Sequence, residues 1–370
     1  MTMAFKDLAR PWVTGLGVYE PGRPIEEVAR ELGLTDAGEI IKLASNENAL
    51  GPSPKAVAAM KRVARQMHLY PDGGAFYLRQ ALADKLQVSA DQILVGSGSN
   101  ELIEFIGHVF LDESVNIVMA DRAFVVYRLV ADMFRARTLA VPMRDFTHDL
   151  EAMRRAITPE TRVVFVANPN NPTGTCVEAA ALDGFIESMP EHVVVVLDEA
   201  YVELMPQDRR PDMLRHVRAG RKVIVLRTFS KAYGLAGLRI GYGIAPAECI
   251  ALMQRVRQPF NTTAMAQAAA LAALDDDDYV ARTRAMVSDG LDALQGAFQK
   301  MKLDYVPSSA NFVMVKVGEG RKVFMAMQRE GVIVRSMDPY GLPEYIRVTV
   351  GTRAENRRCL AVLKRVLKTL

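Results

Sequence analysis

Residues 222–239, KVIVLRTFSKAYGLAGLR, join an apolar run to a cluster of hydroxyl, amine and guanidinium side chains. The apolar residues are typical of a buried strand, and the polar residues follow at its carboxyl end. A lysine in such a turn, Lys231, can form a Schiff base with an aldehyde if its surroundings lower the pKa of its amine. The hydroxyls of Thr228 and Ser230 and the guanidinium of Arg239 together suit a phosphate monoester. Each of these residues taken alone is more typical of a solvated loop, so the prediction depends on their occurring together.

The length and composition indicate a large globular protein. A chain of 370 residues exceeds the usual size of one hydrophobic core, so we expect two domains. Lysine and arginine number 46, aspartate and glutamate 43, and the net charge is +3. Because no basic block is interleaved with aromatic residues, we expect small-molecule partners and no nucleic acid.

The cysteine usage is typical of a reducing compartment. Cys176, Cys249 and Cys359 are widely spaced and form no CxxC or Cys/His cluster. This spacing predicts neither a disulfide framework nor a metal site. Charged residues interrupt the first 19 residues, and no apolar run is long enough to span a bilayer. We therefore expect a soluble cytoplasmic protein without membrane association.

The order of the predicted elements indicates an α/β fold. Strand and helix patterns alternate between residues 93 and 245, which predicts a mostly parallel central sheet flanked by helices. From residue 247 the pattern is helical, and residues 311–370 predict a smaller α/β unit. We expect an N-terminal arm at 1–40 that joins the small domain, a large domain at 41–260 and a small C-terminal domain at 261–370.

Polar residues close two further strands of the predicted sheet. Asp198 ends the apolar run 193–197, and a buried carboxylate is costly unless it meets a cation or hydrogen-bond donors. Two prolines stiffen the backbone around Asn170 and Asn171, which follow the run 162–167. These side chains should meet at the carboxyl edge of the sheet.

A third candidate is the Gly/Ser loop at 96–101, which leads into a helix. The N–H groups at such a helix start attract an anion, although Ser99 or Asn100 serves equally well as a simple N-cap. Phe124 lies after the next strand, where it either stacks on a flat cofactor or belongs to the core.

Taken together, the motifs resemble those of the fold-type I aminotransferases, which use pyridoxal 5'-phosphate. The motifs are NPTG at 171–174, DEAY at 198–201, TFSK at 228–231, Arg239 and Arg347. Within that group the sequence most resembles the histidinol-phosphate aminotransferases, through LASNEN at 43–48, YPD at 70–72, GSGSNE at 96–101, RTFSKA at 227–232 and RVTVGT at 347–352. The resemblance covers nearly the whole chain. Ala49, Asn100 and the pair Arg122-Ala123 depart from the family pattern, which leaves the substrate choice open.

The resemblance implies a catalytic role for residues at the strand ends. Lys231 would bond to the cofactor aldehyde and then transfer protons as a general acid and base. Asp198 would pair with the pyridine nitrogen and raise its pKa. Asn171 and Tyr201 would donate to the ring oxygen, and Phe124 would stack on the ring.

The resemblance also implies how phosphate and substrate are held. The cofactor phosphate would contact Ser99, Asn100, Thr228, Ser230, Arg239 and, from the neighbouring subunit, Tyr70. That last contact implies a homodimer with its sites at the interface. The substrate would contact Arg347 as the principal anion clamp, Arg335 and Tyr19 near its distal phosphate, and Asn48.

The implied reaction is a ping-pong transamination in histidine biosynthesis. L-Histidinol phosphate and 2-oxoglutarate would be interconverted with imidazole-acetol phosphate and L-glutamate. An aromatic amino-acid aminotransferase for phenylalanine or tyrosine is the nearest alternative, and a phospho-threonine decarboxylase is more distant. A transcription regulator with an aminotransferase-like domain is disfavoured, because the residues before the first strand are too few for a DNA-binding module.

Overall fold

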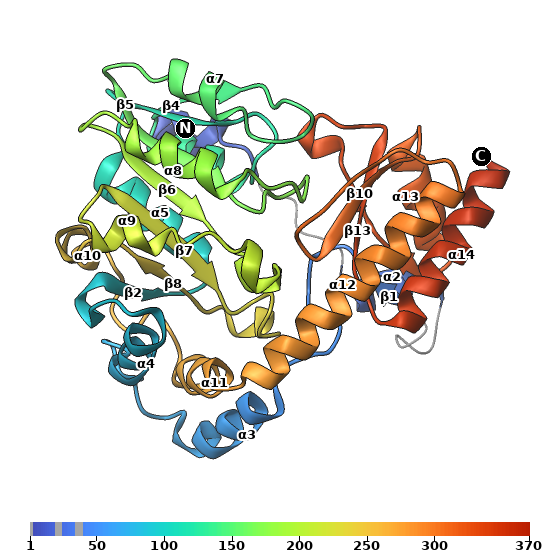
Figure 1. Cartoon of the computed structure of the whole chain (residues 1–370), viewed down its shortest axis with the longest axis horizontal. Coiled ribbons are helices and arrows are strands. Elements are labelled where there is room, and N and C mark those ends of the chain that lie inside the picture. Colours follow the sequence, from blue (N-terminus) through green and yellow to red (C-terminus); the bar gives the residue numbers. More distant parts are fainter. Residues whose placement is uncertain (1–2, 19–23, 34–39) are drawn as a thin grey trace.

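The larger domain is built on a seven-stranded sheet (Figure 1). The computed structural model describes residues 3–18, 24–33 and 40–370. The strand order is β2 (Ile93–Gly96), β8 (Gly241–Ile244), β7 (Val223–Thr228), β6 (Val194–Asp198), β5 (Thr161–Ala167), β3 (Asn116–Ala120) and β4 (Arg137–Val141). Only β8 runs antiparallel to its neighbours in this sheet, so the predicted mostly parallel sheet is confirmed.

The central strands are buried on both faces because their residues alternate between two cores. Val195 and Leu197 of β6 face one core, whereas Val194 and Val196 face the other. Burial of each such side chain contributes about 1.5–3 kcal/mol, so the period-two apolar runs fix both the register and the burial of the sheet.

Helices cover both faces of this sheet. One face is covered by α5 (Ser99–Phe110), α6 (Val126–Met133) and α10 (Ala247–Gln254). The other face is covered by α4 (Phe76–Leu86), α7 (Leu150–Arg155), α8 (Ala179–Glu187), α9 (Leu214–Arg218) and α11 (Ala264–Leu274), with α3 (Pro54–Val63) packed on α11.

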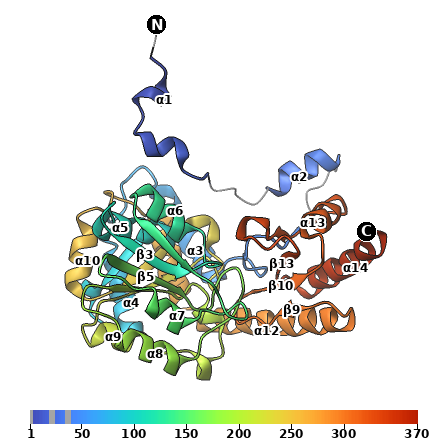
Figure 2. The ribbon, with the colours of Figure 1, turned by 90° about the horizontal axis from the view of Figure 1, so that it is seen from above.

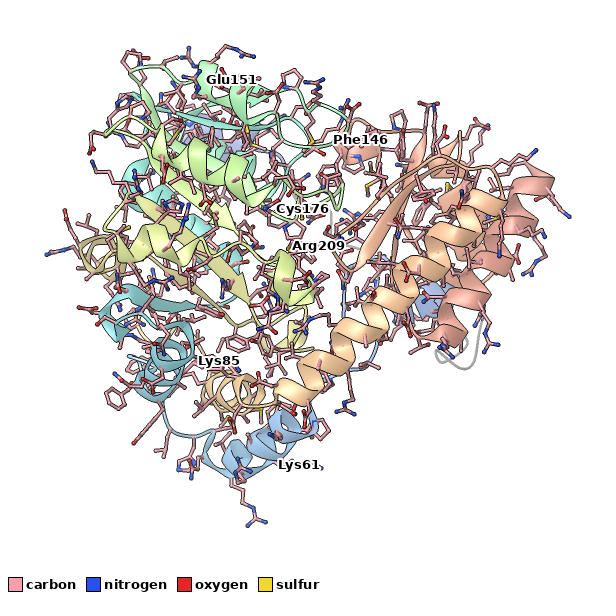
Figure 3. The ribbon with its side chains drawn as sticks, in the orientation of Figure 1. Lys61, Lys85, Phe146, Glu151, Cys176 and Arg209 are labelled. Carbon is pink, nitrogen blue, oxygen red and sulfur yellow. The ribbon has the colours of Figure 1, made fainter. Side chains whose placement is uncertain are left out.

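The smaller domain holds a four-stranded antiparallel sheet at the right of Figure 1. Its order is β12 (Arg335–Ser336), β13 (Tyr345–Thr349), β10 (Phe312–Lys316) and β9 (Tyr305–Val306). Helices α13 (Gly320–Arg329) and α14 (Arg353–Thr369) pack with it, and the long α12 (Asp277–Lys300) links the two domains. Figure 3 places Phe146 and Cys176 at the border between the domains, where the Phe146 ring meets Tyr345 edge-on.

Two segments pack against a different domain from the one that the expected limits assign them to. Helix α11 lies beyond the expected limit at residue 260, yet its alanines, such as Ala266 and Ala273, pack in the core of the large sheet. Small side chains let α11 approach α3 closely, which places it with the large domain. Strand β1 (Ile41–Lys42) lies within the expected large domain but pairs with β11 (Val332–Ile333) of the small domain. The three-part division itself stays a proposal.

The N-terminal segment contains α1 (Phe5–Leu8), η1 (Pro11–Gly15) and α2 (Ile25–Leu32). Figure 2 shows α1 standing away from the body, whereas α2 packs through Val28 and Ala29 against Ile333 of the small domain. The side chain of Trp12 lies near the guanidinium of Arg135, which belongs to the large domain. Within the described residues, no helix is both long and apolar enough to cross a membrane.

Candidate active site

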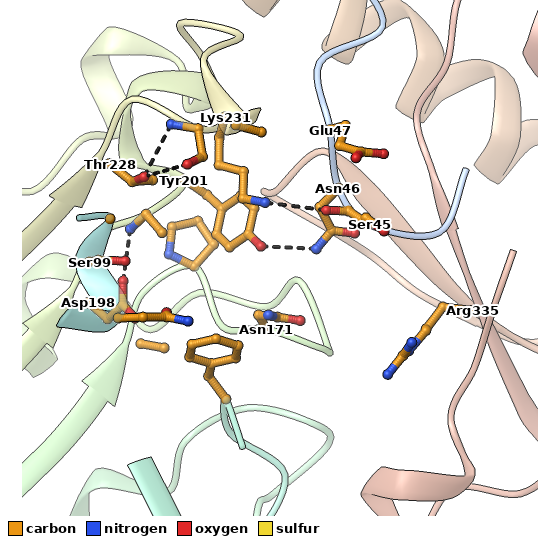
Figure 4. Close-up of a pocket in the computed structure, with 18 of the residues that line it drawn as sticks. Ser45, Asn46, Glu47, Ser99, Asn171, Asp198, Tyr201, Thr228, Lys231 and Arg335 are labelled. Carbon is orange, nitrogen blue, oxygen red and sulfur yellow. Dashed lines mark hydrogen bonds between the residues drawn. The ribbon is translucent and has the colours of Figure 1, made fainter. Parts of the chain in front are cut away.

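A cavity of about 390 Å³ lies at the carboxyl ends of the parallel strands, between the two domains (Figure 4). Most of the predicted site residues line it: Ser99, Asn100, Phe124, Asn171, Asp198, Tyr201, Thr228, Ser230, Lys231, Arg239, Arg335 and Arg347. They come from segments far apart in the chain, and they meet because parallel strands deliver their ends to one edge of the sheet.

Lys231 lies in the turn after β7, with its Nζ 3.4 Å from the carbonyl oxygen of Ser45. Burial, followed by the nearby cation of Arg347, lowers the pKa of its amine to about 8. The turn itself depends on Gly234, which has a φ of 69° and lies so close to the carbonyl of Gly51 that a Cβ would clash. The fold therefore holds an amine that loses its proton readily.

Asp198 ends β6 as a buried carboxylate. It accepts hydrogen bonds from the Tyr127 hydroxyl at 2.6 Å and from the Ala200 N–H at 3.2 Å. Burial raises its pKa, and these neutral donors oppose that effect only partly. A cation in the cavity would therefore be strongly stabilised beside this carboxylate. The sequence motifs gave no role to Tyr127, whose partner lies 71 residues away.

Hydroxyl, guanidinium and backbone N–H groups form a cradle where β7 ends and α5 begins. The Thr228 hydroxyl donates to Ser230 Oγ at 3.0 Å, and the Ser230 N–H donates to Thr228 Oγ1. The guanidinium of Arg239 lies over Gly98, where a Cβ would come within 2.7 Å of it. Because α5 starts at Ser99, its free N–H groups add to the positive potential of this cradle.

Two arginines on adjacent strands face the other end of the cavity. Arg335 of β12 and Arg347 of β13 are directly opposed across the antiparallel pair, so both guanidiniums lie on one face of the sheet. The buried Arg347 donates to Asn171 Oδ1 at 2.6 Å and to the Ala44 carbonyl at 2.9 Å. Like charges at directly opposed positions are unfavourable unless an anion is shared, so this pair fits an anionic ligand.

Tyr201 lies beside Lys231, whose Nζ is 5.8 Å from the centre of its ring. Its hydroxyl accepts a hydrogen bond from Asn46 Nδ2 at 2.9 Å, and burial raises its pKa to about 12. It therefore stays protonated and can donate into the cavity. Asn46 belongs to the LASNEN motif at 43–48, but the sequence alone predicts no role for it.

Three predicted contacts are not among the residues that line the cavity. Asn48 donates instead to the backbone carbonyls of Lys231 and Ala232, so it supports the lysine turn from behind. Tyr70 is 83% exposed and stacks on Phe260, with ring centres 4.7 Å apart. Tyr19 lies outside the described residues.

The lining fits the cofactor that the sequence resemblance implies. The buried carboxylate of Asp198 suits a protonated ring nitrogen, the amine of Lys231 suits an aldehyde, and the cradle at Ser230 suits a phosphate. Phe124 lines the same cavity and offers an aromatic face. The ring nitrogen, the aldehyde, the phosphate and the ring face of pyridoxal 5'-phosphate thus each have a matching side chain.

Comparisons with known proteins agree with this geometry. Residues 38–363 match the family described as aminotransferase class I and II. The chain is 51% identical to the histidinol-phosphate aminotransferase of Akkermansia muciniphila, over 99% of this chain and 100% of that protein. It is 48% identical to the Moorella thermoacetica protein of the same name, over 97% and 92% of the two chains. The structure of histidinol-phosphate aminotransferase from Sinorhizobium meliloti in complex with pyridoxal-5'-phosphate superposes with a TM-score of 0.88 at 29% identity, covering 97% of each chain.

Proposed function

This chain belongs to the class I and II aminotransferases, and we propose that it transfers the amino group of L-histidinol phosphate to 2-oxoglutarate. The products are imidazole-acetol phosphate and L-glutamate, so the reaction belongs to histidine biosynthesis. The chain has the fold-type I architecture and is a transaminase that depends on pyridoxal 5'-phosphate. The opposed pair of Arg335 and Arg347 supports a phosphorylated substrate, because two guanidiniums can share the two charges of a phosphate dianion.

Pyridoxal 5'-phosphate supplies an aldehyde and a ring that withdraws electrons from the carbon bearing the amino group. Lys231 would hold the aldehyde carbon and then move a proton to and from the substrate carbon, because a pKa of about 8 lets its amine both lose and regain a proton near neutral pH. Asp198 would keep the ring nitrogen protonated, since a cation there relieves the cost of the buried carboxylate. Tyr201 and Asn171 would bind the ring oxygen, while Thr228, Ser230, Arg239 and the start of α5 would hold the phosphate.

The two substrates carry different anions, and the arginine pair can accept both. Histidinol phosphate has a phosphate dianion and no carboxylate, whereas glutamate has two carboxylates. A guanidinium binds either group through two parallel N–H donors. Arg347 is buried and fixed by Asn171 and Ala44, so it suits whichever anion the substrate places there, a phosphate in one half-reaction and a carboxylate in the other. Arg335 would contribute to the distal phosphate.

A homodimer is the second part of the proposal. Six large apolar side chains are exposed in or beside the segment that the family resemblance places against a neighbouring subunit: Met67, Leu69, Tyr70, Phe76, Tyr77 and Phe260, which stacks on Tyr70. Aromatic residues left in water in one group are typical of a protein interface. The cytoplasmic location expected from the cysteine usage stays a prediction.

Stopped-flow absorbance of the cofactor-loaded protein tests the reaction. We expect the visible band to change rapidly on mixing with L-histidinol phosphate and more slowly with L-phenylalanine. An equal or larger rate-to-affinity ratio with phenylalanine would instead identify an aromatic amino-acid aminotransferase. If neither amine changes the band, release of carbon dioxide from phospho-threonine should be measured next, and the transamination proposal fails.

A further inference from the structure

Asn46 is a buried residue in the segment that crosses from the small domain to the cavity. Its side chain is 2% exposed, and its backbone has a φ of 56°, in the left-handed region. Asparagine tolerates this conformation better than most residues, whereas a glycine adopts it without strain. Figure 4 shows its amide pointing at the hydroxyl of Tyr201.

The hydrogen bonds around Asn46 fix which way its amide faces. The Asn46 N–H donates to Thr349 Oγ1 at 3.0 Å, so the hydroxyl proton of Thr349 is free to donate to Asn46 Oδ1 at 3.2 Å. The side-chain oxygen is thereby engaged, and the NH₂ group must face Tyr201. Asn311 also donates to the Asn46 carbonyl at 3.0 Å, which holds the backbone in place.

This orientation determines the direction of the Tyr201 proton. A hydroxyl that accepts from an amide on one side directs its own proton elsewhere, and Tyr201 lines the cavity. We propose that Asn46 is a positioning residue that aims the Tyr201 hydroxyl proton into the cavity, where, on the proposed function, it meets the ring oxygen of the cofactor. Asn46 acts through Tyr201 and is not itself a catalytic residue.

The same network joins Tyr201 to the substrate clamp. Thr349 and Arg347 are two residues apart on β13, so their side chains lie on one face of the strand. Thr349 holds the amide of Asn46, while Arg347 binds the carbonyl of Ala44 in the same crossing segment. The small domain therefore supplies both the anion clamp and the support for the Tyr201 hydroxyl.

The test is a pH titration of the visible absorbance of the cofactor-loaded protein. A donor at the ring oxygen stabilises its deprotonated form, so loss of that donor should raise the pH midpoint of the titration. Asn46→Gly removes the amide without straining the left-handed backbone, and we expect an upward shift of about half to one pH unit. Tyr201→Phe removes the donor itself and should shift the midpoint further.

The double variant separates a positioning role from a general effect. If Asn46 acts through Tyr201, Asn46→Gly adds no shift in the Tyr201→Phe background. Asn116→Ala is a matched control, because Asn116 is equally buried and hydrogen-bonded to Thr158 and Thr161 at the amino end of β3. It should leave the midpoint unchanged. An unshifted Asn46→Gly, or the same shift with and without Tyr201, would overturn the proposal.

Two further observations keep the test decisive. If Asn46→Gly does not fold, Thr349→Val decides, because it frees the amide to turn over in a strand that tolerates valine; we expect a smaller upward shift, and no shift overturns the inference. Cofactor affinity of the cofactor-free variants, measured by fluorescence, should fall severalfold for Asn46→Gly and not for Asn116→Ala. Wild-type protein that binds no pyridoxal 5'-phosphate would refute the proposed function, whereas binding with an unchanged variant refutes only the role of Asn46.

Discussion

The guanidinium of Arg347 donates to the side-chain oxygen of Asn171 at 2.6 Å, which links the small domain directly to the loop after β5. Asn171 was predicted as a donor to the cofactor, and this bond occupies its oxygen while leaving its NH₂ group to donate. The same guanidinium stacks over Phe312 at 4.9 Å. The anion clamp is therefore oriented before any substrate arrives.

Replacing Arg347 by lysine should weaken both half-reactions. Lysine keeps the charge but loses the planar fork, so it cannot hold Asn171 and Ala44 while binding an anion through two donors. We expect kcat/KM to fall about 10- to 100-fold for both histidinol phosphate and glutamate in steady-state assays. Arg335→Ala is the comparison variant, and it should lower kcat/KM more for histidinol phosphate than for glutamate. Unchanged kinetics with glutamate for Arg347→Lys would contradict the assignment.

Lys231 should destabilise the cofactor-free fold at neutral pH. Its pKa is lowered from 10.5 to about 8, so the unfolded chain binds the proton more tightly than the folded one. This loss in the free energy of unfolding is fully present below pH 8 and disappears as the pH rises through 8 toward 10.5. Lys231→Ala should therefore melt a few degrees higher than wild type at pH 7, and the gap should shrink steadily above pH 8 to about a quarter of its size at pH 10.

The matched control for that measurement is Lys222→Ala, at an exposed lysine just before the same strand. It should change the melting temperature little at either pH. Lys231→Ala should also abolish turnover while retaining part of the cofactor affinity. A gap that does not vary with pH, or an active Lys231→Ala, would contradict the role given to this amine.

The fold could be predicted closely where apolar runs are long. Residues 193–197 and 222–226 were predicted as strands, and β6 and β7 begin or end within two residues of those limits. Strand β8 was not predicted, because two of its four residues are glycines and the strand shows no alternation of apolar and polar residues. The packing of α11 was not predicted either, because an alanine-rich helix has no polar face that indicates which domain it packs against.

The site could be predicted where each residue closes its own strand. Asp198 and Lys231 each follow a buried run, and parallel topology then brings them together. Tyr127 and Asn46 were missed because their roles depend on partners 71 and 155 residues away. A tyrosine after the Phe124 segment carries no local signal that it will donate to Asp198.

Replacing Tyr127 by phenylalanine should slow catalysis without unfolding the protein. The ring is stacked on Phe165 with centres 4.5 Å apart, and phenylalanine keeps that contact. Loss of the hydroxyl removes the largest effect that lowers the pKa of Asp198, so the carboxylate becomes harder to keep ionised. We expect kcat to fall about 10-fold and cofactor affinity to fall, measured by single-turnover absorbance and equilibrium titration. Asp198→Ala, which removes the carboxylate itself, should lower kcat and cofactor affinity far more. Equal losses in the two variants would contradict a role for Tyr127 that is distinct from that of Asp198.

Mixing two inactive variants should restore activity if Tyr70 serves the neighbouring subunit. Tyr70 is 83% exposed and does not line the cavity of its own chain, so its loss should impair the partner's site. Lys231→Ala and Tyr70→Ala dimers, exchanged by mild denaturation and refolding, would form hybrids in half of all dimers, each with one intact site. About a quarter of the wild-type activity should then return. Sedimentation should show a dimer throughout.

The control is a mixture of Lys231→Ala with Asn171→Ala. Asn171 lines the cavity of its own chain, so these hybrids should regain no intact site. If confirmed hybrids of the Tyr70 mixture regain no activity, Tyr70 does not belong to the partner's site.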